Sequence, residues 1–271
     1  TGIILSAKIK LKNIESAYIR QESIKAENLN EIFRLFEESE DWTYTVAWID
    51  CLQKGKNIGR SILMRGEHAL KVELPFKLAD KPLRLKKKFS PTVPFYFPKF
   101  VLNKFTVKAF NFLYFNKQRP KVVKNIIDYE TFFYPLDAIN DWNRIYGKSG
   151  FIQYQMVIPK EKGEEGMRRI LETIANSGQG SFLAVLKLFG KNNPLAYNSF
   201  PFEGYTLALD FKLNRELVQL VNNLDKIVEE FGGRIYLTKD SMSKSSLTNY
   251  LKNVESSKFT SLQSKRIARG A

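Results

Sequence analysis

Two amides and a lysine at alternating strand positions are the side chains best suited to chemistry in this sequence. Gln153 and Gln155 lie in "GFIQYQMVIPK" (150–160), and Lys187 lies in "SFLAVLKLFG" (181–190). Successive strand residues point to opposite faces of a sheet, so these three can share one face while their apolar neighbours pack against helices. Amide and ammonium groups on one face indicate the floor of a ligand site. A solvated sheet face is the alternative interpretation.

A third strand extends this predicted face. In "GYTLALDFKL" (204–213), Thr206, Ala208 and Asp210 alternate with apolar residues that would face the core. If all three apolar sets face the helices, then Thr206 and Asp210 join the two amides and the lysine on the other side of one sheet.

Several kinds of site are excluded by the sparse cysteine and histidine content. The chain has one cysteine, Cys51, and one histidine, His68. No disulfide can form within the chain, which is typical of a reducing compartment, and a Cys/His zinc cluster is not available. A Ser-His-Asp triad could use only His68, which has no nucleophile elbow nearby. Cys51 ends an apolar run, so we expect a buried thiol rather than a nucleophile.

The net charge favours an anionic partner. The chain carries 43 Lys and Arg against 28 Asp and Glu, for a formal charge of +15. Nucleic acid, a phosphorylated ligand or an acidic membrane surface would each suit this charge, and plain solubility is the alternative. No acid occurs from Lys81 to Ile127, where aromatic residues alternate with Lys and Arg in "PFYFPKFVLNKFTVKAFNFLYFNKQRPK" (94–121). We expect a loop or a short interfacial helix here, with packing over the sheet as the alternative.

The elements that must position these residues form a recognisable series in the second half. Hydrophobic periodicity predicts the order β-α-β-β-α-β, that of a ferredoxin-like unit with an antiparallel sheet and helices on one face, an α+β fold. The predicted strands are 150–160, 181–190, 204–213 and 234–240, and the predicted helices are 164–178 and 214–233.

The first half is compatible with a similar start, although no sequence repeat supports a duplication. Its predicted elements are a strand at 17–25, a helix at 28–41 and strands at 43–51 and 60–65. The last residues, 243–270, indicate two short polar helices. No apolar run reaches the roughly 20 residues that a membrane-spanning helix needs.

Several long motifs in one order resemble a known family. They are "YTVAWIDCLQKGKNIGRSILMRGEH" (44–68), "FFYPLDAINDWNRIYGKSGFIQYQMVIP" (132–159), "LKLFG", "YTLALDF" and "GGRIYLTKDS". Together they resemble the decaprenylphosphoryl-ribose oxidase branch of the vanillyl-alcohol-oxidase-type flavoproteins. The resemblance implies that residues 1–13 hold the last strand of an FAD-binding domain, 14–232 a substrate-binding domain and 233–271 a return segment of the FAD domain. The family's glycine-rich loop and active-site histidine precede this part, so we expect a piece of a longer protein.

The resemblance also implies roles for single residues. Lys239 matches the catalytic lysine beside the flavin ring, where a cation stabilises negative charge on the reduced cofactor. Tyr236 and Ile3 match cofactor contacts. Lys239 pairing with Asp240 and Lys187 as an ordinary exposed lysine are the alternatives. The matches to the sugar pocket are Gln153, Gln155, Lys187, Trp48 as an aromatic wall or else ordinary core, Phe133 and Tyr134 at the rim, and Thr206 in place of an asparagine.

The implied activity is oxidation of a sugar hydroxyl by FAD. The implied substrate is a polyprenyl-phosphate-linked pentose, converted to a keto-sugar in cell-envelope biosynthesis, with a separate short-chain reductase completing an epimerisation. The implied partners are this lipid-linked sugar phosphate and a membrane surface, with a cytoplasmic location at the inner face. Ala208 replaces a cysteine of mycobacterial members, which leaves the exact substrate open. A flavoprotein acting on a soluble sugar or alditol is one alternative, and a basic nucleic-acid-binding module is the other. We expect the chain alone to be inactive.

Overall fold

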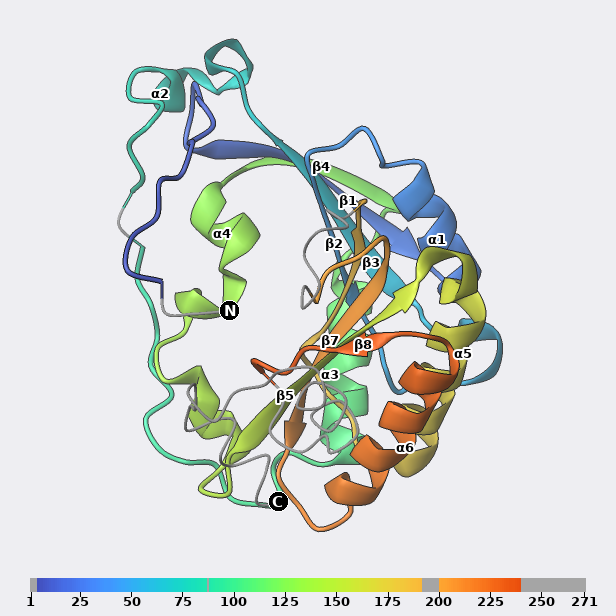
Figure 1. Ribbon diagram of the computed structural model, residues 1–271. Coiled ribbons are helices and arrows are strands. Elements are labelled where there is room, and N and C mark those ends of the chain that lie inside the picture. The colour runs from blue at the N-terminus through green and yellow to red at the C-terminus, as the bar shows by residue number, and fades with distance from the viewer. Residues whose placement is uncertain (1–3, 87, 192–199, 240–271) are drawn as a thin grey trace.

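A single antiparallel sheet organises the computed structural model, which describes residues 4–86, 88–191 and 200–239 (Figure 1). Eight strands lie in the order β4-β1-β3-β2-β6-β7-β5-β8. The strands are β1 (Tyr18–Ala26), β2 (Tyr44–Ile49), β3 (Ser61–His68), β4 (Val122–Asp128), β5 (Phe151–Pro159), β6 (Ala184–Phe189), β7 (Gly204–Lys212) and β8 (Arg234–Ile235). The α-helices are α1 (Leu29–Glu37), α2 (Phe76–Ala79), α3 (Lys104–Lys117), α4 (Tyr129–Phe133), α5 (Gly163–Ser177) and α6 (Leu217–Glu230). Short 3₁₀ turns lie at Gly55–Asn57, Lys71–Glu73, Pro135–Ala138, Trp142–Tyr146 and Lys160–Lys162.

Helices α1, α5 and α6 lie together on one face of the sheet, as Figure 1 shows. Each helix has apolar residues at helical spacing, and those residues are buried in one core with the inward side chains of the strands. The Asn28 side chain begins α1 by accepting a hydrogen bond from the Glu31 N–H at 3.0 Å. Burying one large apolar side chain contributes about 1.5–3 kcal/mol, so these stripes fix which face each helix presents.

The opposite face also carries helices, which corrects the prediction that helices cover one face alone. Helix α3 buries Val107, Asn111 and Phe115, and Phe115 packs with Trp48 and Ile62 of the sheet. Helix α4 lies on the same side, where Phe133 contacts the Tyr44 ring of β2 with centroids 4.9 Å apart. The regular spacing of the other three helices was readable in the sequence, whereas α3 exposes aromatic residues on several sides and gives no clear stripe.

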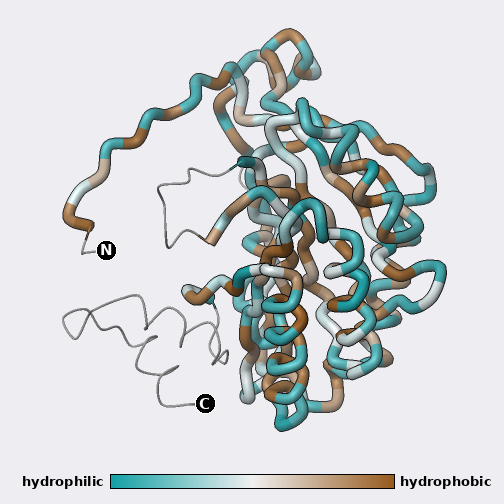
Figure 2. Tube along the Cα trace, turned by 45° about the vertical axis from the view of Figure 1, so that its right-hand side comes forward, coloured by the Kyte–Doolittle hydropathy of each residue, from teal (hydrophilic) through white to brown (hydrophobic). Residues whose placement is uncertain are grey.

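Most predicted elements of both halves are confirmed within a few residues, and the structure differs from the prediction at three places. Strand β8 has two residues rather than seven, because the chain turns at 237–239. Strand β4 was not predicted. Residues 4–13, expected as a strand, are exposed and pair with no described strand (Figure 2). A strand needs a neighbour to bond its backbone groups, and none is offered there. The two C-terminal helices and Ile3 fall outside the described residues.

The two halves of the sheet order their strands in the same way. Counted from the β4 edge, the first half has the order β4-β1-β3-β2. Counted from the β8 edge, the second half has the equivalent order β8-β5-β7-β6. The halves meet where β2 pairs with β6 through two residue pairs, Ala47 with Leu186 and Trp48 with Val185. On the helical face, α1 contacts α5 across this seam, and the Phe33 ring of α1 lies 4.2 Å from the Tyr205 ring of β7.

Candidate functional site

A row of side chains crosses four strands on the sheet face opposite α1, α5 and α6. Trp48 of β2 pairs with Val185 of β6, Val185 pairs with Ala208 of β7, and Ala208 pairs with Gln155 of β5. Neighbouring strands lie about 4.8 Å apart, so the two ends of the row are about 14 Å from each other. The small Ala208 side chain leaves the middle of the row lower than the residues that flank it.

The adjacent row holds Lys187 and Thr206, which pair directly across β6 and β7. The Gln155 side-chain amide donates to the Thr206 hydroxyl at 3.1 Å, and that hydroxyl donates to the Met156 carbonyl at 2.8 Å. These two bonds fix the Thr206 hydroxyl and orient the Gln155 amide, which leaves the Gln155 side-chain oxygen to accept from a ligand. The predicted grouping of both residues on one face is therefore present in the structure.

Gln153 lies one repeat further along β5, opposite Asp210 of β7. Burial raises the pKa of Asp210 to about 6, while a hydrogen bond from Gln153 and the charge of Lys239 act in the opposite direction. The side chain of Asp210 is buried, and its Oδ2 atom accepts no hydrogen bond from the described residues. This end of the face therefore carries the Asp210 carboxyl group beside the Gln153 amide, and the Oδ2 atom of Asp210 is available to a ligand.

Tyr146 brings a second buried polar atom without a protein partner. Its hydroxyl makes no hydrogen bond within the described part of the chain, and its ring is stacked between Phe151 at 4.3 Å and Phe182 at 5.6 Å. Burial and the nearby Asp210 charge both raise the Tyr146 pKa, so the phenol stays protonated. Polar groups buried in this way ordinarily bind water or a ligand, because leaving them unpaired costs about 1–3 kcal/mol each.

Two lysines, Lys187 and Lys239, lie close enough on this face for their charges to interact. Desolvation of the Lys187 ammonium by the surrounding protein lowers its pKa, and the positive charge of Lys239 lowers that pKa further. Lys187 remains solvent-accessible, and no ion pair to an acid forms at either lysine among the described residues. Tyr236, three residues before Lys239, donates its backbone N–H to the Gln155 carbonyl at 2.8 Å, and its ring stacks on Phe200 at 4.7 Å. Residues from β5, β6 and the segment after β8 thus meet here.

Helix α3 covers the Trp48 end of the row. The Trp48 ring is buried, with the Tyr114 ring 4.6 Å away, and its indole N–H donates to the Phe182 carbonyl at 3.1 Å. Trp48 therefore packs as core beneath α3 in this structure, while lying on the face predicted for the sugar pocket.

A buried polar cluster holds α3 in this place. The Asn111 side-chain amide donates to Asp50 Oδ1 at 2.7 Å, and the Arg60 guanidinium donates to Asp50 Oδ2 at 2.8 Å. All three side chains are buried, and Asp50 follows directly after β2. The carboxylate is shared between the sheet and the helix, so it fixes the helix over the Trp48 end of the face.

The remaining predicted residues are not all brought together. Phe133 and Tyr134 lie at the end of α4 and are partly exposed against Tyr44, in the other half of the sheet from Gln153. Their role as a rim stays a prediction. Sequence reasoning did not select Tyr146, because it lies in an irregular segment with no periodicity. Asp210 was placed on the correct face by strand alternation alone.

The cysteine is buried, as the sequence suggested. Cys51 is buried, and its sulfur lies 3.3 Å from the Ser181 carbonyl. Burial raises the Cys51 pKa to about 12, which confirms the prediction of a buried thiol. His68 places its Nδ1 atom 3.2 Å from the Ser16 carbonyl and packs against Tyr44. Among the described helices, none combines the length and the apolar character that crossing a bilayer requires.

Comparison with known proteins identifies a relative with clear sequence similarity. The chain is 39% identical over 246 residues to decaprenylphosphoryl-beta-D-ribose oxidase from Mycolicibacterium smegmatis, a match that covers 89% of this chain and 52% of that protein. This chain is related to that oxidase. It spans about half of the oxidase's length.

Other comparisons are weaker. An uncharacterized Streptomyces coelicolor protein is 25% identical over 250 residues, covering 89% of the chain and 67% of the relative. No protein-family model matches. Among solved structures, the berberine-bridge-enzyme-like (BBE-like) protein #28 from Arabidopsis thaliana is 9% identical, with a TM-score of 0.40 over 93% of this chain and 53% of that one. The relationship to the decaprenylphosphoryl-beta-D-ribose oxidase therefore rests on sequence.

Proposed function

We propose that this chain forms the substrate-binding part of an FAD-linked oxidoreductase that oxidises a sugar hydroxyl to a ketone. The observation that carries this proposal is the grouping of Gln153, Gln155, Thr206 and Lys187 on one sheet face, in a chain related to a sugar-lipid oxidase. Amides and a hydroxyl can donate to and accept from several sugar hydroxyls at once. The proposed substrate is a pentose joined to a polyprenyl phosphate.

The residues at the Lys239 end suit FAD. The charges of Lys187 and Lys239 lie close together, and neither lysine forms an ion pair within the described residues, so a group that gains negative charge would be stabilised there. FAD, when bound, would supply the hydride acceptor. Tyr236 and Lys239 would contact the cofactor, while Gln155 and Lys187 would hold the sugar with its reacting carbon toward it.

The strand order supports a finer fold assignment within the same proposal. Strands β5 to β8 alternate with α5 and α6 as β-α-β-β-α-β and lie in the order β6-β7-β5-β8. We propose that this half is a ferredoxin-like unit, whose open sheet face provides the site.

Flavin reduction tests the proposal directly. In the FAD-loaded protein that contains this chain, a polyprenyl-phosphate pentose should bleach the flavin absorbance under anaerobic conditions, and a free pentose should do so far more slowly. Lys187→Met should lower the apparent second-order rate by about 10- to 100-fold, since it removes a charge-assisted hydrogen bond. The control Lys226→Met, on exposed α6, should leave the rate unchanged. Equal reduction by free sugar would favour a soluble substrate, and no reduction by either would contradict the proposal.

A further inference from the structure

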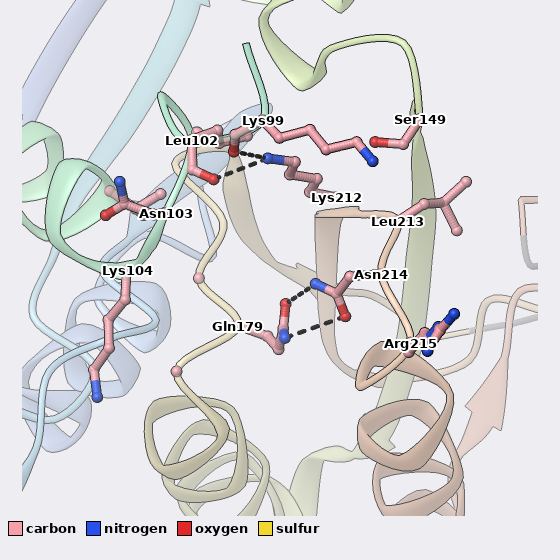
Figure 3. A pocket seen from close by; sticks show the side chains of 13 residues that line it. Lys99, Leu102, Asn103, Lys104, Ser149, Gln179, Lys212, Leu213, Asn214 and Arg215 are labelled. Atoms are coloured by element: carbon pink, nitrogen blue, oxygen red, sulfur yellow. Dashed lines mark hydrogen bonds between the residues drawn. The ribbon is translucent and has the colours of Figure 1, made fainter.

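A cavity lies beyond the Asp210 end of the candidate site. Its volume is about 510 Å³. It opens where the segment before α3, the turn after α5 and the turn after β7 meet, and Figure 3 shows the side chains that line it. Four lining residues are cationic and none is acidic. The cations are Lys99, Lys104, Lys212 and Arg215.

These cations come from separate segments, so the fold rather than the local sequence gathers them. Lys99 lies in the segment before α3, Lys104 is the first residue of α3, and Lys212 ends β7. The Lys212 ammonium donates to the main-chain carbonyls of Lys99 and Leu102, as the dashed lines in Figure 3 show. None of the four forms an ion pair with an acid of the described residues.

Gathering like charges in one cavity is unfavourable unless something compensates. Burial lowers the pKa of Lys212, and the Lys99 charge lowers it further. The neutral lining groups Ser149 and Asn214 add donors, and the Asn214 side-chain amide is held by donating to the Gln179 side-chain oxygen at 2.7 Å. The Glu216 carboxylate, which does not line the cavity, accepts a hydrogen bond from the Gln179 side-chain amide at 3.1 Å. An oxyanion with several acceptor oxygens would use these cations and donors together.

From these observations we infer that this cavity binds a phosphate group. Ammonium and guanidinium groups recognise phosphate through charge-assisted hydrogen bonds, and the cavity supplies both. The inference does not require FAD chemistry, and it rests on the proposed function only for the identity of the molecule that carries the phosphate.

The position of the cavity connects it with the candidate sugar site. Lys212 follows Asp210 by two residues on β7, so the two side chains share a sheet face about 7 Å apart. The cavity therefore lies at the Asp210 end of the site. A sugar phosphate lying along β7 could place its ring at Gln153 and its phosphate in the cavity.

Phosphate titration of the chain, without any flavin, tests the inference. Amide signals of Ser149, Gln179 and Asn214 should shift with inorganic phosphate in NMR spectra, and should not shift with chloride at equal ionic strength. The double variant Lys212→Met/Arg215→Gln should weaken phosphate binding at least tenfold. The control Lys108→Gln/Lys117→Gln, on exposed positions of α3, should change it less than twofold. Circular dichroism would establish that both variants are folded.

The results separate the phosphate site from its carrier and from the proposed enzyme. Equal losses in the two double variants, or none in either, would overturn the inference. Hexyl phosphate that competes with inorganic phosphate and binds more tightly would support a lipid-linked carrier, whereas binding of inorganic phosphate alone would support the site and exclude that carrier. Binding to anionic vesicles alone would overturn the site. Failure of flavin reduction with intact phosphate binding would contradict the proposed function alone.

Discussion

Burial of Asp210 beside Gln153 couples one carboxyl group to the stability of the chain. Its pKa is raised to about 6 in the folded protein, against 3.8 for an ordinary aspartate, so between these values the folded state holds a proton that the unfolded state has lost. The protonated Asp210 therefore contributes fully to the free energy of unfolding below about pH 4, and this contribution is lost as the pH rises to about 6. A shift of this size corresponds to at most about 3 kcal/mol.

The variant Asp210→Asn should remove this pH dependence. We expect the free energy of unfolding of the native chain, measured with urea, to fall by up to about 3 kcal/mol more between pH 4 and 6 than that of the variant. Asp41→Asn, at an exposed position, serves as the control and should follow the native curve. Parallel curves for the native chain and Asp210→Asn would show that this carboxyl is not strained by burial.

At the scale of the element, α3 depends on one buried polar contact. Asn111→Ala removes the donor to Asp50 and leaves a small cavity, so we expect a loss of about 1–3 kcal/mol in the free energy of unfolding. The variant should also expose Trp48, detectable as faster quenching of its fluorescence by acrylamide. Asn116→Ala, on an exposed position of the same helix, is the matched control. Equal effects of the two changes would show that Asn111 does not anchor α3.

How far the elements could be predicted depends on how regular their sequences are. Strands β5 and β7 and helices α5 and α6 were predictable because their apolar residues repeat with one clear period. Strand alternation was also sufficient to place Gln153, Gln155 and Lys187 on one face. Strand β4 was missed because its burial is partial, and the docking of α3 was not predictable because it depends on Asn111 meeting Asp50, 61 residues away in sequence.

At the scale of the whole molecule, the basic and aromatic surface of α3 suggests a partner. Phe105, Phe112 and Leu113 are exposed, with Lys108 between them on the outer side of the helix. Exposed apolar side chains with flanking lysines are suited to the interface of an anionic bilayer, where lysine stems lie along the lipid and the charges reach the phosphates. We propose that this surface docks on an anionic membrane.

Vesicle sedimentation tests this docking. The native chain should pellet with vesicles containing anionic lipid and much less with neutral ones. Phe105→Ser/Leu113→Ser should weaken vesicle binding at least tenfold, since it removes two apolar side chains from the contact. Val218→Ser, at an exposed position of α6, should have no such effect. Retention of binding by the α3 variant would refute docking through this helix.

The narrow join between β2 and β6 has a mechanical consequence. A load that pulls β4 away from β5 acts in series on the strand pairs between them, and the two residue pairs that join β2 to β6 form the shortest ladder in that series. The backbone ladder would part there first. The two halves of the sheet would then be joined by packing on the helical face, which includes the contact between the Phe33 and Tyr205 rings. The packing of the helices, rather than the backbone hydrogen bonds between β2 and β6, would therefore set the force at which the halves separate.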